Sequence, residues 1–437
     1  MQYGKIFLKT LCALAAAAAP LAANAAAPSK DSSPFMAGAV RIDITPTDLS
    51  GLNPMTGKAF DRVHDPIFAR LIVLSKGAQT AVLVSLDVIE VGDMDAPRQR
   101  IARETGIPAD HIMITATHDH NAPRLGTVTP GALAHPPGPE VLAYTDVVIG
   151  KIIAGIKTAR AQARPAQYGV GRGSADINVN RDEYTSKGWA IGFNPQGPSD
   201  KTVTVVRFAD TDGKTIAAIV NYPVHGTVML GANVLSGDLP EAVTRYVEAG
   251  LGGDAVVLYA QGALGDQAPR VSHEGPKTTG AQIEAAWQEA QAQGLMLGAE
   301  ALRVLGTIGP MHPAHSLGAM DSRFSCPAKR GTNQMSDMHQ ETVAEIPIRL
   351  SMIRFDDVAL GGVSGEVLTN IYRHLKAQSP LSDTLLISLT NDRIGYLPED
   401  SAYDRPIFEV KGSPVQRGCA EDGIVDGLIG MIGKLKP

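Results

Sequence analysis

The chain has 437 residues, of which 44% are hydrophobic and 19% charged, and its formal net charge is −6. This length and apolar content support a large buried core, which excludes an intrinsically disordered protein. The acidic balance argues against nucleic acid, or an anionic membrane surface, as the main partner.

The first 25 residues predict a secretory signal peptide. Two lysines precede a short stretch rich in Leu and Ala, and Ala23-Asn24-Ala25 supplies a small-x-small cleavage site. Residues 26–35 are then a linker and residues 36–437 one large domain. We therefore expect a periplasmic or secreted protein with no integral membrane span after cleavage. An uncleaved anchor is the alternative.

Two cysteines, Cys326 and Cys419, remain after the signal peptide. In an exported protein they can form one disulfide, but the sequence leaves their pairing open. They are too far apart in sequence for a CxxC metal site, so we do not expect cysteine ligands.

The first part of the domain predicts a β-α-β unit. Because its strands are parallel, Asp87 and His118 should emerge at the same carboxyl edge of the sheet, where open α/β sheets build their sites. Period-two patterns and apolar runs predict strands at residues 36–44, 65–75, 79–86 and 112–117, with a helix at residues 96–105.

The rest of the chain predicts further helices and strands, including hairpins at 201–221 and 346–363. We expect a helix over 139–163 to cover the sheet, Asp238 to be a helix N-cap and residues 188–199 to be a loop. Residues 309–338 carry no readable pattern. Further strands are predicted at 201–208, 214–221, 255–260, 346–355, 358–363 and 384–389, with helices at 238–248, 283–305 and up to residue 376. The fold class is α/β, with mixed β-sheets layered with helices in a single large domain and a site at the carboxyl ends of strands.

The apolar run 112–117 ends in His118-Asp119-His120. Residues two apart in a strand point the same way, so we expect His118 and His120 to look out together, one ligating a metal and the other handling protons. A His-x-His pair by itself also occurs in surface loops, so it needs support from elsewhere in the chain.

That support comes from other predicted strands, which also end in residues that bind metals or move protons. They are Asp87, His225, Asp266, Glu366 and Tyr396. Taken singly, each has a structural explanation, such as a helix cap or a core position. Two histidines, a glutamate and an oxygen donor together suit zinc, whose catalytic sites keep one position open for water.

Two competing kinds of site are disfavoured. The chain has no Gly-x-Ser-x-Gly, because residues 362–366 read Gly-Val-Ser-Gly-Glu. It also has no phosphate-binding glycine-rich loop followed by Lys-Ser/Thr.

Residues 117–123, Thr-His-Asp-His-Asn-Ala-Pro, resemble the Thr-His-Thr-His-Ser-Gly-Pro signature of the neutral, non-lysosomal ceramidases. The likeness spans most of the domain in short blocks that follow in the same order: Asn180-Arg181, Val224 to Thr227, Ser236 to Asp238, Gly265-Asp266, Gly365-Glu366 and Tyr396 to Glu399. It implies the N-terminal zinc amidase domain of that family. The sequence stops at Pro437, and we expect no counterpart of the family's C-terminal β-sandwich domain.

The resemblance also implies roles for individual residues. The positions that match the family's metal ligands are His118, His225, Glu366 and Tyr396. His120 matches the proton-handling histidine, and Arg181 lines the same pocket. Zinc would lower the pKa of bound water and polarise the scissile carbonyl, while His120 passes a proton to the leaving amine. Tyr396 and Arg181 would offset charge on the oxyanion.

Two departures from the family pattern concern the substrate. Ala268 stands where the family has a serine expected to bond the primary alcohol of a ceramide, and Phe408 replaces a second pocket tyrosine. Both changes remove a hydroxyl. A site that no longer bonds a substrate hydroxyl loses its strongest means of requiring one, which argues against ceramide itself.

The sequence thus predicts an exported hydrolase with one catalytic Zn²⁺ that cleaves the amide bond of a small acyl amide or lipid-like substrate. A zinc-dependent ester or lactone hydrolase is one alternative. A non-catalytic, zinc-stabilised periplasmic binding protein is the other.

Overall fold

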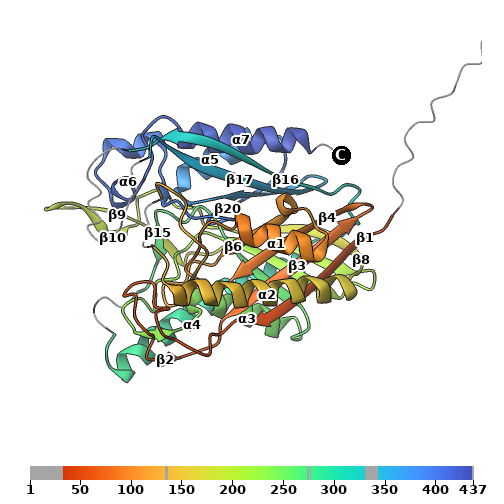
Figure 1. The fold of residues 1–437 in the computed structure, drawn as a ribbon, viewed down its shortest axis with the longest axis horizontal. Helices are drawn as coiled ribbons and strands as arrows, with labels where there is room; N and C mark the ends of the chain where they lie inside the picture. The colour runs from red at the N-terminus through yellow and green to blue at the C-terminus, as the bar shows by residue number, and fades with distance from the viewer. Residues whose placement is uncertain (1–32, 133–135, 273–274, 276, 330–342, 436–437) are drawn as a thin grey trace, which may run out of the picture. The chain divides into compact units, whose positions relative to one another are not determined.

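The computed structural model describes residues 33–132, 136–272, 275, 277–329 and 343–435 (Figure 1). The predicted signal peptide lies outside the described residues, as does most of the linker. Residues 33–437 form one compact unit.

The larger sheet has eight strands in the order β14-β12-β11-β8-β1-β3-β4-β6. Its strands are β1 (Phe35–Asp43), β3 (Phe68–Lys76), β4 (Gln79–Leu86), β6 (Ile112–Ala116), β8 (Arg164–Ser174), β11 (Thr202–Asp210), β12 (Thr215–Tyr222) and β14 (Val256–Gln261). The pairs β4–β6 and β12–β14 are parallel and the other pairs antiparallel, so the predicted mixed sheet is confirmed.

This sheet curls until its two edges approach each other. Its halves are joined by only two residue pairs between β1 and β8, which leaves room for a sharp bend. Across the edges, the Ser85 hydroxyl donates to the Tyr259 carbonyl at 2.6 Å, and Gln261 Nε2 donates to the Thr117 carbonyl at 2.5 Å. The curl brings the residues that follow β6 next to those that follow β12.

A second sheet packs against the first. It contains β16 (Gly318–Pro327), β17 (Glu345–Phe355), β18 (Val358–Val363) and β20 (Asp383–Ile387). Phe355 and Leu360 on one face join Phe208 and Leu258 of the larger sheet in a shared core. Residues 309–338, in which the sequence has no readable pattern, therefore contain a strand, β16.

Helices cover the outer faces of both sheets (Figure 1). Those on the larger sheet are α1 (Asp95–Thr105), α2 (Pro139–Ala161), α3 (Asp238–Gly250) and α4 (Gly280–Thr307). The helices on the second sheet are α5 (Thr369–Gln378) and α7 (Ala420–Lys434), and they share a core with its outward face. Among the described residues, no helix has the length and hydropathy needed to cross a bilayer.

A disulfide joins Cys326 in β16 to Cys419, the residue before α7. The two cysteines, whose pairing the sequence left open, are therefore bonded to each other. It ties an edge strand of the second sheet to the helix that covers that sheet.

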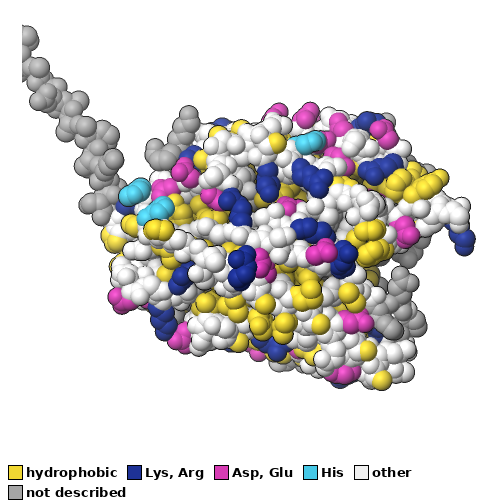
Figure 2. Space-filling model, turned by 180° about the vertical axis from the view of Figure 1, so that it is seen from behind, with side chains coloured by type: hydrophobic (Ala, Val, Ile, Leu, Met, Phe, Trp, Pro, Cys, Tyr) yellow, Lys and Arg dark blue, Asp and Glu magenta, His cyan; other side chains and the backbone are white. Residues whose placement is uncertain are grey.

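Short elements complete the fold around the site. They are β2 (Arg62–Val63), β5 (Glu90–Val91), β7 (Arg124–Leu125), β9 (Asn178–Thr185), β10 (Gly188–Asn194), β13 (Val234–Leu235), β15 (Gln267–Pro269), β19 (Glu366–Val367), β21 (Tyr396–Leu397), α6 (Phe408–Lys411) and two 3₁₀ turns, η1 (Ala109–His111) and η2 (Asp400–Asp404). The prediction of a loop over 188–199 is wrong, because residues 188–194 pair with β9 as a hairpin. This hairpin projects at the right of Figure 2, with hydrophobic side chains along it.

The prediction that Asp238 is a helix N-cap is also wrong. Gly237 holds the N-cap position of α3, and Asp238 is the first helical residue with φ of +49°. Its buried carboxylate instead accepts the backbone N–H groups of Met229 and Leu239, at 2.9 and 2.7 Å. Asp238 thus fixes the loop before the helix.

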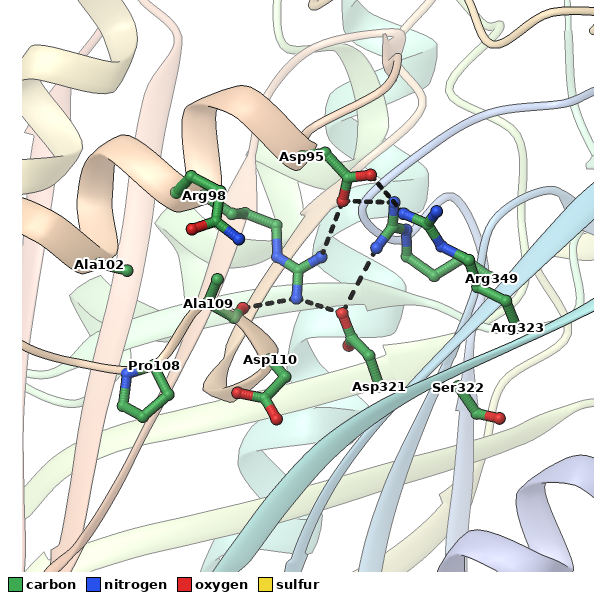
Figure 3. Close-up of a pocket in the computed structure, with 11 residues that line it drawn as sticks. Asp95, Arg98, Ala102, Pro108, Ala109, Asp110, Asp321, Ser322, Arg323 and Arg349 are labelled. Atoms are coloured by element: carbon green, nitrogen blue, oxygen red, sulfur yellow. Dashed lines mark hydrogen bonds and ion pairs between the residues drawn. The ribbon is translucent and has the colours of Figure 1, made fainter.

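Buried arginines join α1 to the second sheet (Figure 3). Arg98 is 2% exposed. It donates to the Ile112 carbonyl at 2.9 Å, to the Ala109 carbonyl at 2.5 Å and to the Asp321 carboxylate of β16. A cavity of about 780 Å³ lies beside this cluster, but none of the residues predicted for the site lines it. We therefore assign this cavity to the joint between α1 and the second sheet and not to the chemistry.

We expect Arg98→Met to lower the free energy of unfolding by about 3 kcal/mol, because it leaves the mostly buried Asp321 carboxylate and two carbonyls short of a donor. Arg100 on the same helix supplies the matched control, since its ion pairs with Glu104 and Asp146 are at the surface. Arg100→Met should change stability little. Denaturant unfolding followed by circular dichroism measures both. Equal losses in the two variants would contradict the assigned role of Arg98.

Candidate metal centre and active site

Three separate segments converge at one place. His118 and His120 follow β6, His225 follows β12, and Glu366 begins β19. The backbones of the two histidine segments run side by side, because the His120 N–H donates to the Gly226 carbonyl at 2.9 Å. The convergence depends on the curl of the larger sheet, since β6 is one edge strand and β12 lies next to the other.

The backbone at His118 departs from a strand. β6 ends at Ala116, and His118 has φ of +66°, in the left-handed region. Strand alternation therefore does not orient His118 and His120, and that part of the prediction is wrong. The outcome is nevertheless the predicted one, because the two Nε2 atoms lie 3.3 Å apart. Hydrogen bonds hold the turn: His118 N–H donates to the Val88 carbonyl at 3.0 Å, and the His118 carbonyl accepts from Gly226 N–H at 3.3 Å.

Backbone carbonyls orient two of the imidazoles. His118 Nδ1 lies 2.6 Å from the Ile89 carbonyl oxygen, and His225 Nδ1 lies 2.9 Å from the Gln267 carbonyl oxygen. A carbonyl only accepts, so each Nδ1 carries the proton and each Nε2 keeps a lone pair. This is the arrangement by which proteins prepare histidines as metal ligands.

The ligand atoms are spaced as a metal site requires. Glu366 Oε2 lies 3.4 Å from His118 Nε2 and 3.3 Å from His225 Nε2. Tetrahedral zinc with bonds of about 2.0–2.1 Å holds its ligand atoms roughly 3.3 Å apart. Among the described residues, no donor forms a hydrogen bond to the buried Glu366 Oε2, which suits a metal-ligand atom. The potential ligand nitrogens of His118, His120 and His225 also lie within 4.8 Å of one another.

The other carboxylate oxygen of Glu366 is anchored by Arg393. Arg393 Nη2 donates to Glu366 Oε1 at 3.1 Å, and Arg393 Nε lies 3.2 Å from Glu90. Burial by itself would raise the pKa of the Glu366 carboxyl, but His118, His225 and Arg393 outweigh burial and hold this pKa well below its usual value. Glu366 is therefore an anion at neutral pH, as a metal ligand must be.

Arg181 contacts several groups of the site. It donates to the Tyr396 hydroxyl at 3.1 Å and to the Gly265 carbonyl at 2.7 Å, and its Nη1 lies 3.1 Å from His225 Nε2. An ion bound by His225 would replace this last contact. Glu409 in α6 accepts from Arg181 Nε at 2.6 Å and so fixes the plane of the guanidinium.

Tyr396 is a buried phenol beside Glu366. These two residues are register partners in the parallel pair β19–β21, and the Tyr396 ring packs edge-on against Phe408 at 5.7 Å between centroids. Burial, followed by the charge of Glu366, raises the pKa of Tyr396 above its usual value. The hydroxyl is thus protonated at neutral pH and available as a donor.

His120 differs from the other two histidines. Its Nδ1 is buried and bonds to no other group among the described residues. Burial, followed by the neighbouring imidazoles of His118 and His225, places the pKa of His120 well below its ordinary value, so its ring is neutral. Burial and Arg181 likewise lower the pKa of His225 to about 3.

The two residues predicted to contact substrate lie close to this group. Phe408 is half-buried in α6, against Tyr396 and below the Arg181 guanidinium, 5.7 Å from the ring centre. Ala268 is half-buried in β15, one residue after the Gln267 carbonyl that orients His225. Their contact with substrate stays a prediction, as does metal ligation by Tyr396.

Asp87 and Asp266, which were also predicted at the ends of strands, belong to structural hydrogen-bond networks. Asp87 pairs with the buried Arg70 at 2.8 Å and accepts the Phe68 N–H at 2.9 Å. Asp266 accepts from the Thr369 hydroxyl at 2.7 Å and from Asn180 Nδ2 at 3.0 Å. Both carboxylates support the backbone behind the site.

Sequence reasoning missed Arg393, Glu90 and Glu409. Arg393 lies three residues before Tyr396, so its place beside a candidate ligand was a usable signal. Glu409 follows Phe408 directly, but only the fold reveals that it is buried against Arg181.

Comparison with known proteins identifies the family of the chain. Residues 51–301 match the family described as neutral/alkaline non-lysosomal ceramidase, N-terminal. The neutral ceramidase of Pseudomonas aeruginosa is 24% identical over 320 residues, which cover 67% of this chain but only 45% of that protein. The chain thus spans less than half of that relative's length.

Two solved structures share the fold. The crystal structure of neutral ceramidase from Pseudomonas aeruginosa matches with a TM-score of 0.72 at 18% identity, over 93% of this chain and 76% of that one. A ceramidase complexed with C2 matches with a TM-score of 0.70 at 17% identity, over 92% and 76% of the two chains. The family match covers more than half of the sequence and the structural matches nearly all of it, and from these together the chain belongs to the neutral/alkaline non-lysosomal ceramidase family.

Proposed function

We propose that this protein is an exported, zinc-dependent amidohydrolase that cleaves the N-acyl bond of a small acyl amide or lipid-like substrate. The observation that carries the proposal is Glu366 Oε2, a buried carboxylate oxygen that bonds to no hydrogen-bond donor among the described residues, 3.3–3.4 Å from the Nε2 atoms of two imidazoles whose Nδ1 atoms are bonded to backbone carbonyls. Family membership supports amide hydrolysis as the reaction class.

The metal would be held by His118, His225 and Glu366, with Tyr396 as the fourth ligand that the family resemblance implies. When bound, zinc supplies Lewis acidity to the scissile carbonyl and lowers the pKa of water. The rest of the chemistry falls to protein side chains. His120, neutral and within 3.3 Å of His118, accepts a proton from the attacking water and returns it to the leaving amine.

Arg181 and Tyr396 are placed to stabilise developing charge. Both are buried, and the Arg181 guanidinium is held by Glu409, so it needs no reorganisation as the oxyanion forms. Fixed donors in a site shielded from water stabilise a transition state more than mobile ones do. The pair therefore suits the tetrahedral intermediate of acyl transfer.

Ala268 and Phe408 bear on the substrate class. Neither side chain can bond a hydroxyl, so we propose an acyl amide other than ceramide, without a required primary alcohol. The disulfide between Cys326 and Cys419 supports export, because such bonds persist in oxidising compartments. The signal-like first 25 residues agree with that compartment.

Metal analysis and a substrate panel test the proposal. We expect about one zinc per chain, loss of hydrolysis on chelation, and recovery on zinc addition, with turnover on simple acyl amides exceeding turnover on ceramides. Faster turnover of esters or lactones would favour that alternative chemistry. Retained zinc without turnover on any class would contradict an enzyme and favour a zinc-stabilised binding protein.

A further inference from the structure

Large apolar side chains are exposed together on the β9–β10 hairpin. Tyr184 is 72% exposed, Ile191 52% and Phe193 47%. These three residues, called here the ribbon patch, include both of the large aromatic side chains that are exposed among the described residues. Figure 2 shows hydrophobic side chains along the projecting segment at the right.

Exposure of the apolar side chains of this hairpin does not stabilise the fold. β10 is an edge strand, paired only with β9, so its apolar residues have no third strand to pack against. Exposed apolar groups contribute almost nothing to folding, whereas their removal from water on docking is favourable. A concentrated apolar patch on a surface marks an interaction site.

The ribbon patch is continuous with the candidate active site. Strand β9 contains both Arg181, which contacts His225, and Tyr184. Across the hairpin, Tyr184 pairs with Trp189 at 5.2 Å between ring centroids. Trp189 and Phe408 both pack against the buried cluster that contains Tyr396. Aromatic side chains thus lead from the site to the tip of the hairpin.

Cations surround the aromatic rings. Lys187 is exposed in the turn of the hairpin. The guanidinium of Arg270 lies 5.6 Å from the Phe193 ring centre, and that of Arg405 lies 5.4 Å from the Trp189 ring centre. An apolar and aromatic surface edged by cations complements a phospholipid interface, with acyl chains below and phosphates above.

We propose that the ribbon patch docks the protein onto the surface of a phospholipid bilayer, with its apolar side chains inserted at the level of the headgroups. Because the net charge of the chain is −6, binding must come mainly from apolar insertion, with Lys187 contacting phosphates. Arg270 and Arg405 already pair with Asp176 and Glu399, at 3.2 and 3.9 Å, and contribute less. The hairpin then holds the entrance of the site against the layer from which a lipid-like substrate would come. The docking itself does not rest on the proposed hydrolysis, because it is measured without turnover.

Vesicle sedimentation tests the docking. The probes are phosphatidylcholine vesicles with and without phosphatidylglycerol. We expect the unaltered protein to sediment with both, and the triple variant Tyr184→Ser, Ile191→Ser, Phe193→Ser to bind at least about tenfold more weakly. Lys187→Glu should weaken binding to the vesicles with phosphatidylglycerol most.

A second triple variant provides the control. Leu142→Ser, Val147→Ser, Met296→Ser removes apolar side chains that are 42–56% exposed on α2 and α4, and it should bind as the unaltered protein does. Every variant keeps the same first 32 residues, so any lipid affinity of that segment cancels. Equal binding by the two triple variants, or no binding by the unaltered protein, would overturn the proposal. A fall in molecular mass for the ribbon variant alone would instead identify the patch as a contact between copies, and would also overturn it.

Discussion

Glu366→Gln should abolish zinc binding and reduce hydrolysis at least about a thousandfold. Glu366 Oε2 is the one anionic atom that approaches both His118 Nε2 and His225 Nε2 within 3.4 Å. Glutamine keeps the shape but removes the charge. It also lets an amide N–H donate to the imidazole lone pairs that a metal would otherwise take.

That substitution separates loss of metal from loss of fold. The bond from Arg393 to Oε1 survives in glutamine, and the new N–H gives the imidazoles a neutral partner. We therefore expect the metal-free variant to unfold at a temperature no lower than the metal-free parent. Elemental analysis, hydrolysis and thermal unfolding measured on the same samples give the three results.

Glu90→Gln is the matched control for Glu366→Gln. Glu90 is also buried and also pairs with Arg393, at 3.2 Å, but its second ion pair is with Arg124, at 3.7 Å, and not with an imidazole. A residue that only supports a ligand costs about 10–100-fold when changed, so zinc should be retained at saturating concentration. Zinc retained in Glu366→Gln, or lost equally from both variants, would contradict ligation by Glu366.

The hydrophobic pattern of the sequence predicts many of the single helices and strands of this fold. β4 (Gln79–Leu86), α2 (Pro139–Ala161) and the β17–β18 hairpin lie close to where the hydrophobic pattern predicts them. Each is a run long enough for one period to dominate. β10 escaped prediction because its apolar residues stay exposed and it pairs only at an edge, so the usual burial pattern is absent.

Long-range geometry could not be predicted in the same way. The residues His118, His225 and Glu366 were identified from polar strand ends and family resemblance, but what brings them together is the curl of the sheet. That curl depends on contacts such as Ser85 to Tyr259, which are 174 residues apart. The left-handed backbone at His118 is held by bonds to Val88 and Gly226, which local propensity does not encode.

His120→Ala should retain zinc and lose hydrolysis by about 10²–10⁴-fold, the usual contribution of a proton-transferring side chain. The geometry makes this a demanding test, because His120 Nε2 lies 3.3 Å from His118 Nε2 and the three histidines are close enough to ligate one ion together. The two roles differ at the other ring nitrogen. His118 and His225 each donate Nδ1–H to a carbonyl, as oriented ligands do, whereas His120 Nδ1 bonds to no group among the described residues.

A ring without such an orienting bond suits a group that exchanges protons better than one that holds a metal, since the second bond fixes the tautomer of a ligand. Metal content therefore decides between the roles: zinc retained with hydrolysis lost supports proton transfer, and zinc lost with hydrolysis makes His120 a third histidine ligand. His64→Ala is the control for removing an imidazole, because His64 is half-buried and pairs with Asp65 at 2.9 Å, outside the metal cluster. It should leave both zinc and turnover unchanged, and unchanged turnover in His120→Ala would remove His120 from the chemistry altogether.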